Sequence, residues 1–193
     1  MKIISAEFIK SATRPSEYPW GNFPEVAIAG KSNVGKSSLI NALVNRRNLA
    51  KTSSSPGRTQ LINFFLVNGK ISLVDLPGYG YARVPLQVRK TWKPMVESYL
   101  QTRKEIRLVI LILDARRGAS PDDLALLDWL DYHEILSLIV LTKADKLSQI
   151  ERARQKKALA DVSLLSGKTL SFFSAVTGEG KEELWRLIQE ALD

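Results

Sequence analysis

One eight-residue segment has the glycine, lysine and serine spacing of a phosphate-binding loop. Residues 30–37 read Gly-Lys-Ser-Asn-Val-Gly-Lys-Ser and fit the pattern G-x-x-x-x-G-K-[ST]. Glycines in such a loop let backbone N–H groups converge on an anion, and the helix that follows adds partial positive charge. Lys36 would contact the β- and γ-phosphates, and the Ser37 hydroxyl would coordinate Mg²⁺. The candidate nucleotide-binding residues of this segment are Gly30, Lys31, Ser32, Asn33, Val34, Gly35, Lys36 and Ser37.

The residues on either side of this loop predict the elements that it needs. Val26 to Ala29 is an apolar run that predicts a buried parallel strand, and Ser38 to about Asn45 has helical spacing. A strand, a glycine loop and a helix in that order present backbone amides to a phosphate. We therefore expect the segment to bind a nucleotide phosphate rather than to be a chance glycine-rich turn.

A second candidate lies at the end of another predicted strand, residues 71–75. Ligands of parallel α/β sheets bind at the carboxyl ends of the strands. Asp75 can hold Mg²⁺ through its water shell, because this ion retains several waters and needs few carboxylates. Gly78 has no side chain in the way of its backbone N–H, which can therefore reach the γ-phosphate. The predicted binding residues are Asp75, Leu76, Pro77 and Gly78.

Two further strand ends predict which base is bound. Asp145 follows the predicted strand 136–141, and its carboxylate can accept two hydrogen bonds side by side. Guanine presents N1–H and N2–H₂ in that geometry, whereas adenine has no such pair of donors. Lys143 can lay its apolar stem along the base, and the backbone after the predicted strand 169–173 can donate to guanine O6. We expect GTP or GDP to be bound here by Thr142, Lys143, Ala144, Asp145, Phe173, Ser174 and Ala175.

The polar loop 46–60 contains a candidate sensor of the γ-phosphate. Thr59 is its best metal ligand, since a hydroxyl can complete the Mg²⁺ shell when a γ-phosphate draws the loop in. The alternative is that Thr59 only begins the next strand. The predicted metal ligands are thus Ser37, Thr59 and Asp75. The nucleotide-binding residues of this region are Gly57, Arg58, Thr59, Gln60 and Leu61.

The order of the predicted elements indicates an α/β fold of the P-loop NTPase type. Apolar strands alternate with helices, which predicts one doubly wound, mostly parallel sheet with helices on both faces. Asn68-Gly69 predicts a tight hairpin between strands 61–67 and 71–75, so one strand runs antiparallel. Further strands are expected at 3–9 and 108–114, and helices at 92–100 (with a kink or late start at Pro94), from Ser120, at 148–164 and at 181–192. We expect residues 1–193 to form a single domain with an N-terminal extension, residues 1–23.

Composition limits the kinds of protein that are possible. The 193 residues include no cysteine, which excludes disulfides and thiol chemistry, and 45% are hydrophobic, enough for one core. The longest apolar run, residues 108–113, is too short to cross a bilayer. No secretory signal opens the chain. We expect a soluble, cytoplasmic monomer without membrane insertion.

The net charge of +8 is unevenly distributed. Residues 30–60 carry six Lys or Arg and no acid, and residues 83–107 carry seven against two acids. A bound nucleotide accounts for only a few of these cations. The remainder indicates a polyanionic partner, RNA or an anionic membrane, although a solvated basic face is an equal alternative.

These motifs together resemble one family of GTPases. The segments Gly-Lys-Ser-Asn-Val-Gly-Lys-Ser, Pro-Gly-Arg-Thr-Gln, Asp-Leu-Pro-Gly-Tyr-Gly-Tyr-Ala and Thr-Lys-Ala-Asp, with Ser174-Ala175 and the short N-terminal extension, are similar to the EngB (YihA/YsxC) GTPases. That family lies within the TrmE–Era–EngA group. The resemblance implies a bacterial cytoplasmic GTPase needed for assembly of the large ribosomal subunit and also linked to cell division and septation. The implied partner is the large subunit or its precursor.

One position departs from the small signalling GTPases, which place a water-orienting Gln after the glycine of this motif. Here the residue is Tyr79, so we expect slow hydrolysis by the isolated protein. The resemblance implies that Asn33 helps to hold a K⁺ that supplies positive charge. Bracing of the loop is an equal alternative for Asn33, and Arg58 is a further candidate source of charge, so these interpretations stay open. The expected catalytic residues are Lys36, Thr59, Gly78 and Asn33.

Two basic clusters are candidates for binding RNA: Arg89, Lys90 and Lys93, and Arg152, Arg154, Lys156 and Lys157. The first follows the second phosphate-site loop, so we expect it to carry the nucleotide-dependent part of ribosome binding. A regulatory GTPase at the membrane or septum is the alternative, but no amphipathic helix rich in Trp or Phe opposite lysines supports it. A metabolic P-loop kinase would leave Thr-Lys-Ala-Asp unexplained.

Overall fold

The computed structural model describes residues 1–51, 61–79 and 86–193, and for residues 86–92 it describes the backbone alone. Its centre is a seven-stranded sheet with the order β1-β3-β4-β2-β5-β6-β7. The sequence order reverses on either side of β2, which is the doubly wound arrangement predicted from the sequence. The strands are β1 Ala6–Ala12, β2 Glu25–Gly30, β3 Ile62–Val67, β4 Ile71–Asp75, β5 Ile106–Asp114, β6 Ser137–Thr142 and β7 Leu170–Phe173.

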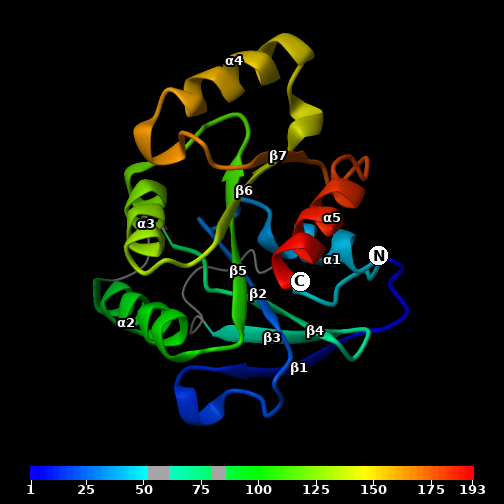
Figure 1. The fold of residues 1–193 in the computed structure, drawn as a ribbon, viewed down its shortest axis with the longest axis vertical. Coiled ribbons are helices and arrows are strands. Elements are labelled where there is room, and N and C mark those ends of the chain that lie inside the picture. Colours follow the sequence, from blue (N-terminus) through cyan, green and yellow to red (C-terminus); the bar gives the residue numbers. More distant parts are fainter. Residues whose placement is uncertain (52–60, 80–85) are drawn as a thin grey trace.

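Helices lie on both faces of this sheet. Figure 1 shows α2 and α3 on one side and α1 and α5 on the other, with α4 beyond the β7 end. The helices are α1 Lys36–Leu43, α2 Leu86–Thr102, α3 Pro121–Tyr132, α4 Gln149–Ala160 and α5 Lys181–Leu192. Short 3₁₀ segments are η1 Pro15–Glu17, η2 Ala144–Lys146 and η3 Ser163–Leu165. No helix of the described residues is long and apolar enough to cross a membrane.

The strands are apolar on both faces because each face packs against helices. In β2, Ala27 and Ala29 belong to the core under α2 and α3, whereas Val26 and Ile28 belong to the core under α1 and α5. All four side chains are buried. A strand buried on both faces reads as a continuous apolar run, so the alternation expected of a half-exposed strand is absent.

β3 is the strand that runs against its neighbours. It pairs antiparallel with β4 through the turn at Asn68-Gly69, as predicted, and antiparallel with β1 on its other side. The other strand pairs of the sheet are parallel. The first strand was predicted too early, at residues 3–9. It spans Ala6–Ala12 because it pairs with β3 from Ala6 opposite Val67 to Ala12 opposite Ile62, with a shift in register between Phe8 and Lys10.

Two helix predictions need correction. The helix predicted over 148–164 ends at Ala160, because Val162 has extended backbone angles and the chain continues into η3. The helix α2 begins at Leu86, so Pro94 does not mark a late start but lies within it. A proline removes one helical hydrogen bond, and burial of Val96, Tyr99 and Leu100 favours the helix despite that loss.

A buried polar cluster fixes the C-terminal end of α2. Glu25, at the start of β2, is 1% exposed. Its carboxylate accepts hydrogen bonds from the Tyr99 hydroxyl at 2.7 Å and from the Arg103 guanidinium at 2.8 and 3.0 Å. A buried carboxylate is tolerated only when it is paired and hydrogen-bonded in this way. The cluster therefore ties the end of α2 to the start of the central strand.

Candidate functional site

The phosphate loop begins where β2 ends and finishes at the first turn of α1. Gly30 has φ 154°, and a Cβ there would lie 2.8 Å from the Ile112 backbone oxygen. Gly35, at the N-cap of α1, has φ 113°, a left-handed conformation that favours glycine. Both positions therefore require glycine. The sequence prediction of a strand, a loop and a helix is confirmed here.

The ammonium group of Lys36 lies inside this loop. Lys36 Nζ donates to the Gly30 backbone oxygen at 3.4 Å, and a Cβ added to Gly78 would lie 2.7 Å from the same nitrogen. Burial lowers the pKa of Lys36, and the charge of Asp75 acts against that shift. A buried ammonium close to an anionic side chain is suited to a ligand that brings more negative charge.

Asp75 ends β4 and carries an oxygen without a protein partner. Its Oδ1 is buried and accepts no hydrogen bond among the described residues. Burial raises the pKa of Asp75 to about 6, against the effect of the Lys36 charge. Such an orphaned carboxylate oxygen beside the phosphate loop fits a divalent cation. The Ser37 hydroxyl, the other described candidate ligand, donates to the Lys51 backbone oxygen at 3.3 Å.

The segment after Asp75 is hydrogen-bonded to the phosphate loop. The Ser32 amide donates to the Tyr79 backbone oxygen at 2.9 Å, and the Ser32 hydroxyl donates to that of Gly78 at 3.2 Å. A Cβ at Gly78 would lie 3.0 Å from the Ser32 backbone, so the two segments approach too closely for a side chain. The structure thus brings together the first two predicted groups of binding residues.

The Tyr79 side chain lies in the core that also contains the buried side chains of α3. It is 7% exposed, and its hydroxyl donates to Asp123 Oδ1 at 2.5 Å. Burial is the main cause that raises the pKa of Tyr79, and Asp123 adds to the shift. The other oxygen of Asp123 accepts the Ser120 amide and hydroxyl, which caps α3. Tyr79 therefore links the phosphate site to α3 and does not present its hydroxyl to a ligand there.

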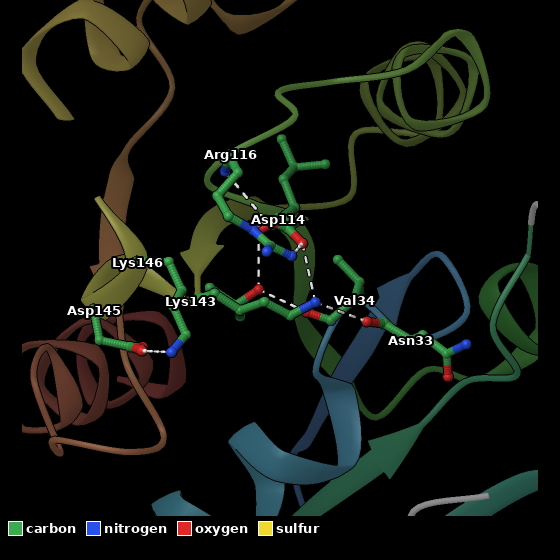
Figure 2. A network of polar contacts seen from close by, with 9 residues as sticks. Asn33, Val34, Asp114, Arg116, Lys143, Asp145 and Lys146 are labelled. Atoms are coloured by element: carbon green, nitrogen blue, oxygen red, sulfur yellow. Dashed lines mark hydrogen bonds and ion pairs between the residues drawn. The ribbon is translucent and has the colours of Figure 1, made fainter. Parts of the chain in front are cut away.

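Thr142 and Lys143, at the end of β6, also contact the phosphate loop, and Figure 2 shows the contact from Lys143. The Thr142 hydroxyl, 3% exposed, lies 2.7 Å from the Val34 backbone oxygen, so it supports the loop instead of facing a base. Lys143 Nζ donates to the Asn33 backbone oxygen at 3.0 Å. The Asn33 side chain points away from these contacts in Figure 2, so what Asn33 contributes to loop bracing is its backbone carbonyl.

Asp114 is a site residue that the sequence reasoning missed. It ends β5, and its carboxylate accepts Lys143 Nζ at 2.9 Å and the Arg116 guanidinium at 2.6 and 2.9 Å. The bonds from Arg116, then those from Lys143, hold the pKa of Asp114 well below its usual range. The missed signal was an acid at the end of an apolar strand, the same signal that identified Asp75.

Asp145 and Ser174 lie side by side at the ends of β6 and β7. The Ser174 hydroxyl donates to Asp145 Oδ1 at 2.7 Å, and this bond is the main cause that lowers the pKa of Asp145. The Ser174 amide already donates to the Glu179 backbone oxygen, which leaves Ala175 as the backbone donor of the predicted pair. Phe173 is buried in the core, so only its backbone is placed at the site.

The remaining predicted residues differ in where they lie. Leu76 and Ala144 are buried, and Lys31 is 3.7 Å from Asp122 in an ion pair. Leu61 directly precedes β3. Gly57, Arg58, Thr59 and Gln60 lie outside the described residues. Arg152 was predicted to bind RNA, but its side chain is only 16% exposed and is paired with Glu179. We therefore no longer count it among the candidate RNA-binding cations of α4.

A seven-stranded doubly wound sheet with a phosphate loop between β2 and α1 defines a P-loop NTPase fold. Residues 25–143 match the protein family described as 50S ribosome-binding GTPase. A protein named "Probable GTP-binding protein EngB" in Citrifermentans bemidjiense is 55% identical over 192 residues, covering 100% of this chain and 90% of the relative. The protein of the same name in Geotalea daltonii is 56% identical, covering 100% and 93%. The chain belongs to the EngB family of GTP-binding proteins.

Solved structures agree with this assignment. The crystal structure of a probable GTP-binding protein engB superimposes with a TM-score of 0.70 at 25% identity, covering 86% of this chain and 97% of the other. The structure of Era in complex with MgGDPNP and a segment of 16S ribosomal RNA has a TM-score of 0.66 at 21% identity, covering 88% and 56%. The likeness to Era shows a shared fold.

Proposed function

We propose that this GTPase is Mg²⁺-dependent, hydrolyses GTP slowly when isolated, and acts as a switch in assembly of the large ribosomal subunit. The observation that carries the chemical part is the pair formed by Lys36 and Asp75. A buried ammonium lies in the glycine loop, and beside it a buried carboxylate oxygen has no described partner. A nucleotide phosphate with its metal would satisfy both groups.

The roles of the residues follow from their positions. The backbone of Gly30–Ser37 and Lys36 would hold the phosphates, and Ser37, Asp75 and Thr59 would hold Mg²⁺. The metal, when bound, would neutralise charge that develops between the β- and γ-phosphates. Asp145 would accept the two guanine donors, and the Ala175 amide would reach guanine O6. Together these residues form one GTP site across the sheet's carboxyl edge.

The position of Tyr79 supports slow hydrolysis. Tyr79 stands where small signalling GTPases have the Gln whose amide orients the attacking water. The Tyr79 hydroxyl cannot take over that role, because it is bound to Asp123 in the core. Hydrolysis also needs positive charge beside the phosphates. A K⁺ held by Asn33 is one candidate source of that charge, and Arg58 is another. Hydrolysis rates in KCl and NaCl, for Asn33→Ala and Arg58→Ala, distinguish them. Only the substitution that removes the source of positive charge should reduce the maximal rate of hydrolysis.

Two substitutions test the phosphate site. Lys36→Ala should abolish nucleotide binding or hydrolysis, because it removes the positive charge that contacts the phosphates. Thr59→Ala should leave GDP binding unchanged and weaken the GTP-bound state. Titration calorimetry with GDP and a non-hydrolysable GTP analogue measures both effects. Equal losses for the two nucleotides in Thr59→Ala would exclude a γ-phosphate sensor, and equal wild-type affinities for ATP and GTP would exclude the guanine site.

The ribosomal part of the proposal is supported by the family description and by the basic surface. The chain has a net charge of +8, and Arg154, Lys156 and Lys157 are exposed on α4. Co-sedimentation with large ribosomal subunits and with anionic liposomes, each with GDP or a GTP analogue, tests it. We expect GTP-dependent binding to the subunit. Binding to liposomes alone would favour a regulatory GTPase at the membrane.

A further inference from the structure

The side chain of Arg152 lies at the junction of the two loops that carry Asp145 and Ser174. It extends from the first turn of α4 and is 16% exposed. Its Nη2 donates to the Ala144 backbone oxygen at 2.7 Å, and its Nε donates to that of Leu147 at 3.3 Å. The guanidinium therefore fixes the backbone on both sides of Asp145.

The other side of the same guanidinium binds the loop after β7. Arg152 forms a two-pronged ion pair with Glu179, one bond of which is 3.0 Å long. A planar guanidinium that meets a carboxylate at two points sets direction as well as distance. The pair is partly shielded, since the Glu179 side chain is 40% exposed and Arg152 lies over the Phe172 ring at 5.7 Å.

Glu179 is itself connected to Ser174, which closes the set of contacts into a ring. The Glu179 backbone oxygen accepts the Ser174 amide at 3.0 Å, and the Ser174 hydroxyl donates to Asp145 at 2.7 Å. Asp145 follows Ala144, whose carbonyl binds Arg152. Two of these links, Ser174 to Asp145 and Arg152 to Glu179, join one loop to the other, so moving either loop relative to the other strains both.

The loop after β7 has little freedom to adopt another path. Gly180 has φ 79°, and a Cβ there would lie 1.9 Å from the Phe172 backbone oxygen. The amides of Val176 and Thr177 both donate to the Ser174 hydroxyl at 3.2 Å. The backbone is thus held at Ser174 and at Gly180, and Arg152 joins this held loop to the loop that carries Asp145.

We propose that Arg152 is a positioning residue for guanine specificity, which holds the Asp145 carboxylate in the orientation that reads guanine N1–H and N2–H₂. This inference rests on the assignment of Asp145 to the base in the proposed function. Arg152 does not touch the nucleotide itself. Its contribution is to fix the two loops relative to each other before the base arrives, which lowers the cost of binding.

The test compares GDP with inosine diphosphate, which lacks the 2-amino group. Dissociation constants are measured by calorimetry for the wild type and for Arg152→Gln, Arg152→Lys and Glu179→Gln. Arg186→Gln is the matched control, because Arg186 also pairs with a glutamate, Glu190, but does so within one helix and is 59% exposed. We expect Arg152→Gln to weaken GDP binding about tenfold, the size of losing one charge-assisted hydrogen bond.

The decisive quantity is the ratio of the two dissociation constants. A purely structural arginine would lower the melting temperature and leave this ratio unchanged, whereas a positioning residue should bring it toward one. Arg152→Lys should restore part of the ratio, and Glu179→Gln, which also serves if Arg152→Gln does not fold, should reduce it. An unchanged ratio in a folded Arg152→Gln or Glu179→Gln variant would overturn the inference. Equal wild-type affinities for GDP and inosine diphosphate would instead overturn the base assignment.

Discussion

Asp145 is placed to act as a double acceptor. Ser174 occupies its Oδ1 with one hydrogen bond at 2.7 Å, and the side chain remains 12% exposed at the edge of the sheet. A carboxylate oxygen has two lone-pair directions, so this bond orients the group without using up its capacity. The serine thus orients the carboxylate, which in the proposed site would read the base.

Replacing Asp145 with asparagine should change the preferred base. Asp145→Asn substitutes one acceptor with a donor, which mismatches guanine and should cost about 2–4 kcal/mol of GDP binding. Xanthine has a carbonyl where guanine has its amine, so xanthosine diphosphate should bind relatively better. Competition titrations of the two nucleotides check this. A parallel loss for both would show that Asp145 does not contact the base.

Asp114 should contribute stability that depends on pH. Its pKa is lowered in the folded protein, so its contribution is fully present above the unfolded pKa near 4 and is lost progressively as pH falls from there through the lower folded pKa. Asp114→Asn should therefore reduce the free energy of unfolding by about 2 kcal/mol at pH 7, the scale of a hydrogen bond to a charged group. Thermal unfolding at pH 7 and at pH 3.5 measures this. The difference between variant and wild type should shrink at the lower pH.

Sequence alone predicted which residues lie at strand ends, but not how their side chains pair. Apolar runs stop at Asp75, Asp114 and Thr142, so each end is visible in the sequence. The bond from Lys143 to Asp114 depends on β5 and β6 being neighbours, which only the assembled sheet shows. Arg152 was assigned to an RNA surface for the same reason. Its charge is visible in the sequence, but its pairing with Glu179 is seen only in the folded structure.

At the scale of elements, Tyr79 joins the loop after β4 to the start of α3. Its hydroxyl is the partner of Asp123, an acid that also caps the helix. One buried carboxylate therefore serves two elements. A tyrosine in place of glutamine and a capped helix are both visible in the sequence, but nothing there indicates that the two are bonded.

Removing the Tyr79 hydroxyl should affect stability more than catalysis. Tyr79→Phe keeps the ring and leaves a buried oxygen of Asp123 with one partner fewer, which should cost about 1–3 kcal/mol of unfolding free energy. The maximal GTPase rate should stay within about twofold, because the hydroxyl is bound to Asp123 in the core. A factor of two corresponds to less than about 0.5 kcal/mol in barrier height. Denaturation and single-turnover hydrolysis measure the two quantities.

The control for this experiment is Tyr132→Phe, because the Tyr132 side chain is 83% exposed. That variant should change neither stability nor rate. A large loss of rate in Tyr79→Phe at unchanged stability would contradict the placement of Tyr79 outside the reaction, and would assign its hydroxyl a role with the attacking water.

At the scale of the whole molecule, two groups of cations remain candidates for contact with ribosomal RNA. Arg154, Lys156 and Lys157 are exposed on α4. Lys93 is exposed on α2, where it lies 3.6 Å from Glu97, whereas the side chains of Arg89 and Lys90 lie outside the described residues. The α2 group follows the phosphate site in sequence, and the α4 group follows the base loops.

Charge reversal in each group should separate general binding from its nucleotide dependence. Removing one cation that binds an RNA phosphate should flatten the log–log salt slope of particle binding by about 0.7–0.9. We expect reversal at 89, 90 and 93 to reduce the preference for the GTP analogue, and reversal at 154, 156 and 157 to weaken binding with both nucleotides equally. Sedimentation at several salt concentrations measures this. An intact preference after reversal in α2 would show that α2 does not couple the nucleotide to RNA.

The bonds of Tyr99 and Arg103 to Glu25 fix the C-terminal end of α2, whereas its N-terminal end at Leu86 lies far from that cluster. Between Leu86 and Tyr99 the helix rises about 20 Å, at about 1.5 Å per residue. Any tilt of α2 about the Glu25 cluster is therefore magnified along its length, so that about 10° displaces the Leu86 end by about 3 Å, while Tyr99 hardly moves. In such a tilt the start of β2, where Glu25 lies, would be the pivot of the helix. Because Leu86 follows the phosphate-site segment in sequence, a displacement of about 3 Å at that end would need a tilt of only about 10° and would leave the Glu25 cluster in place.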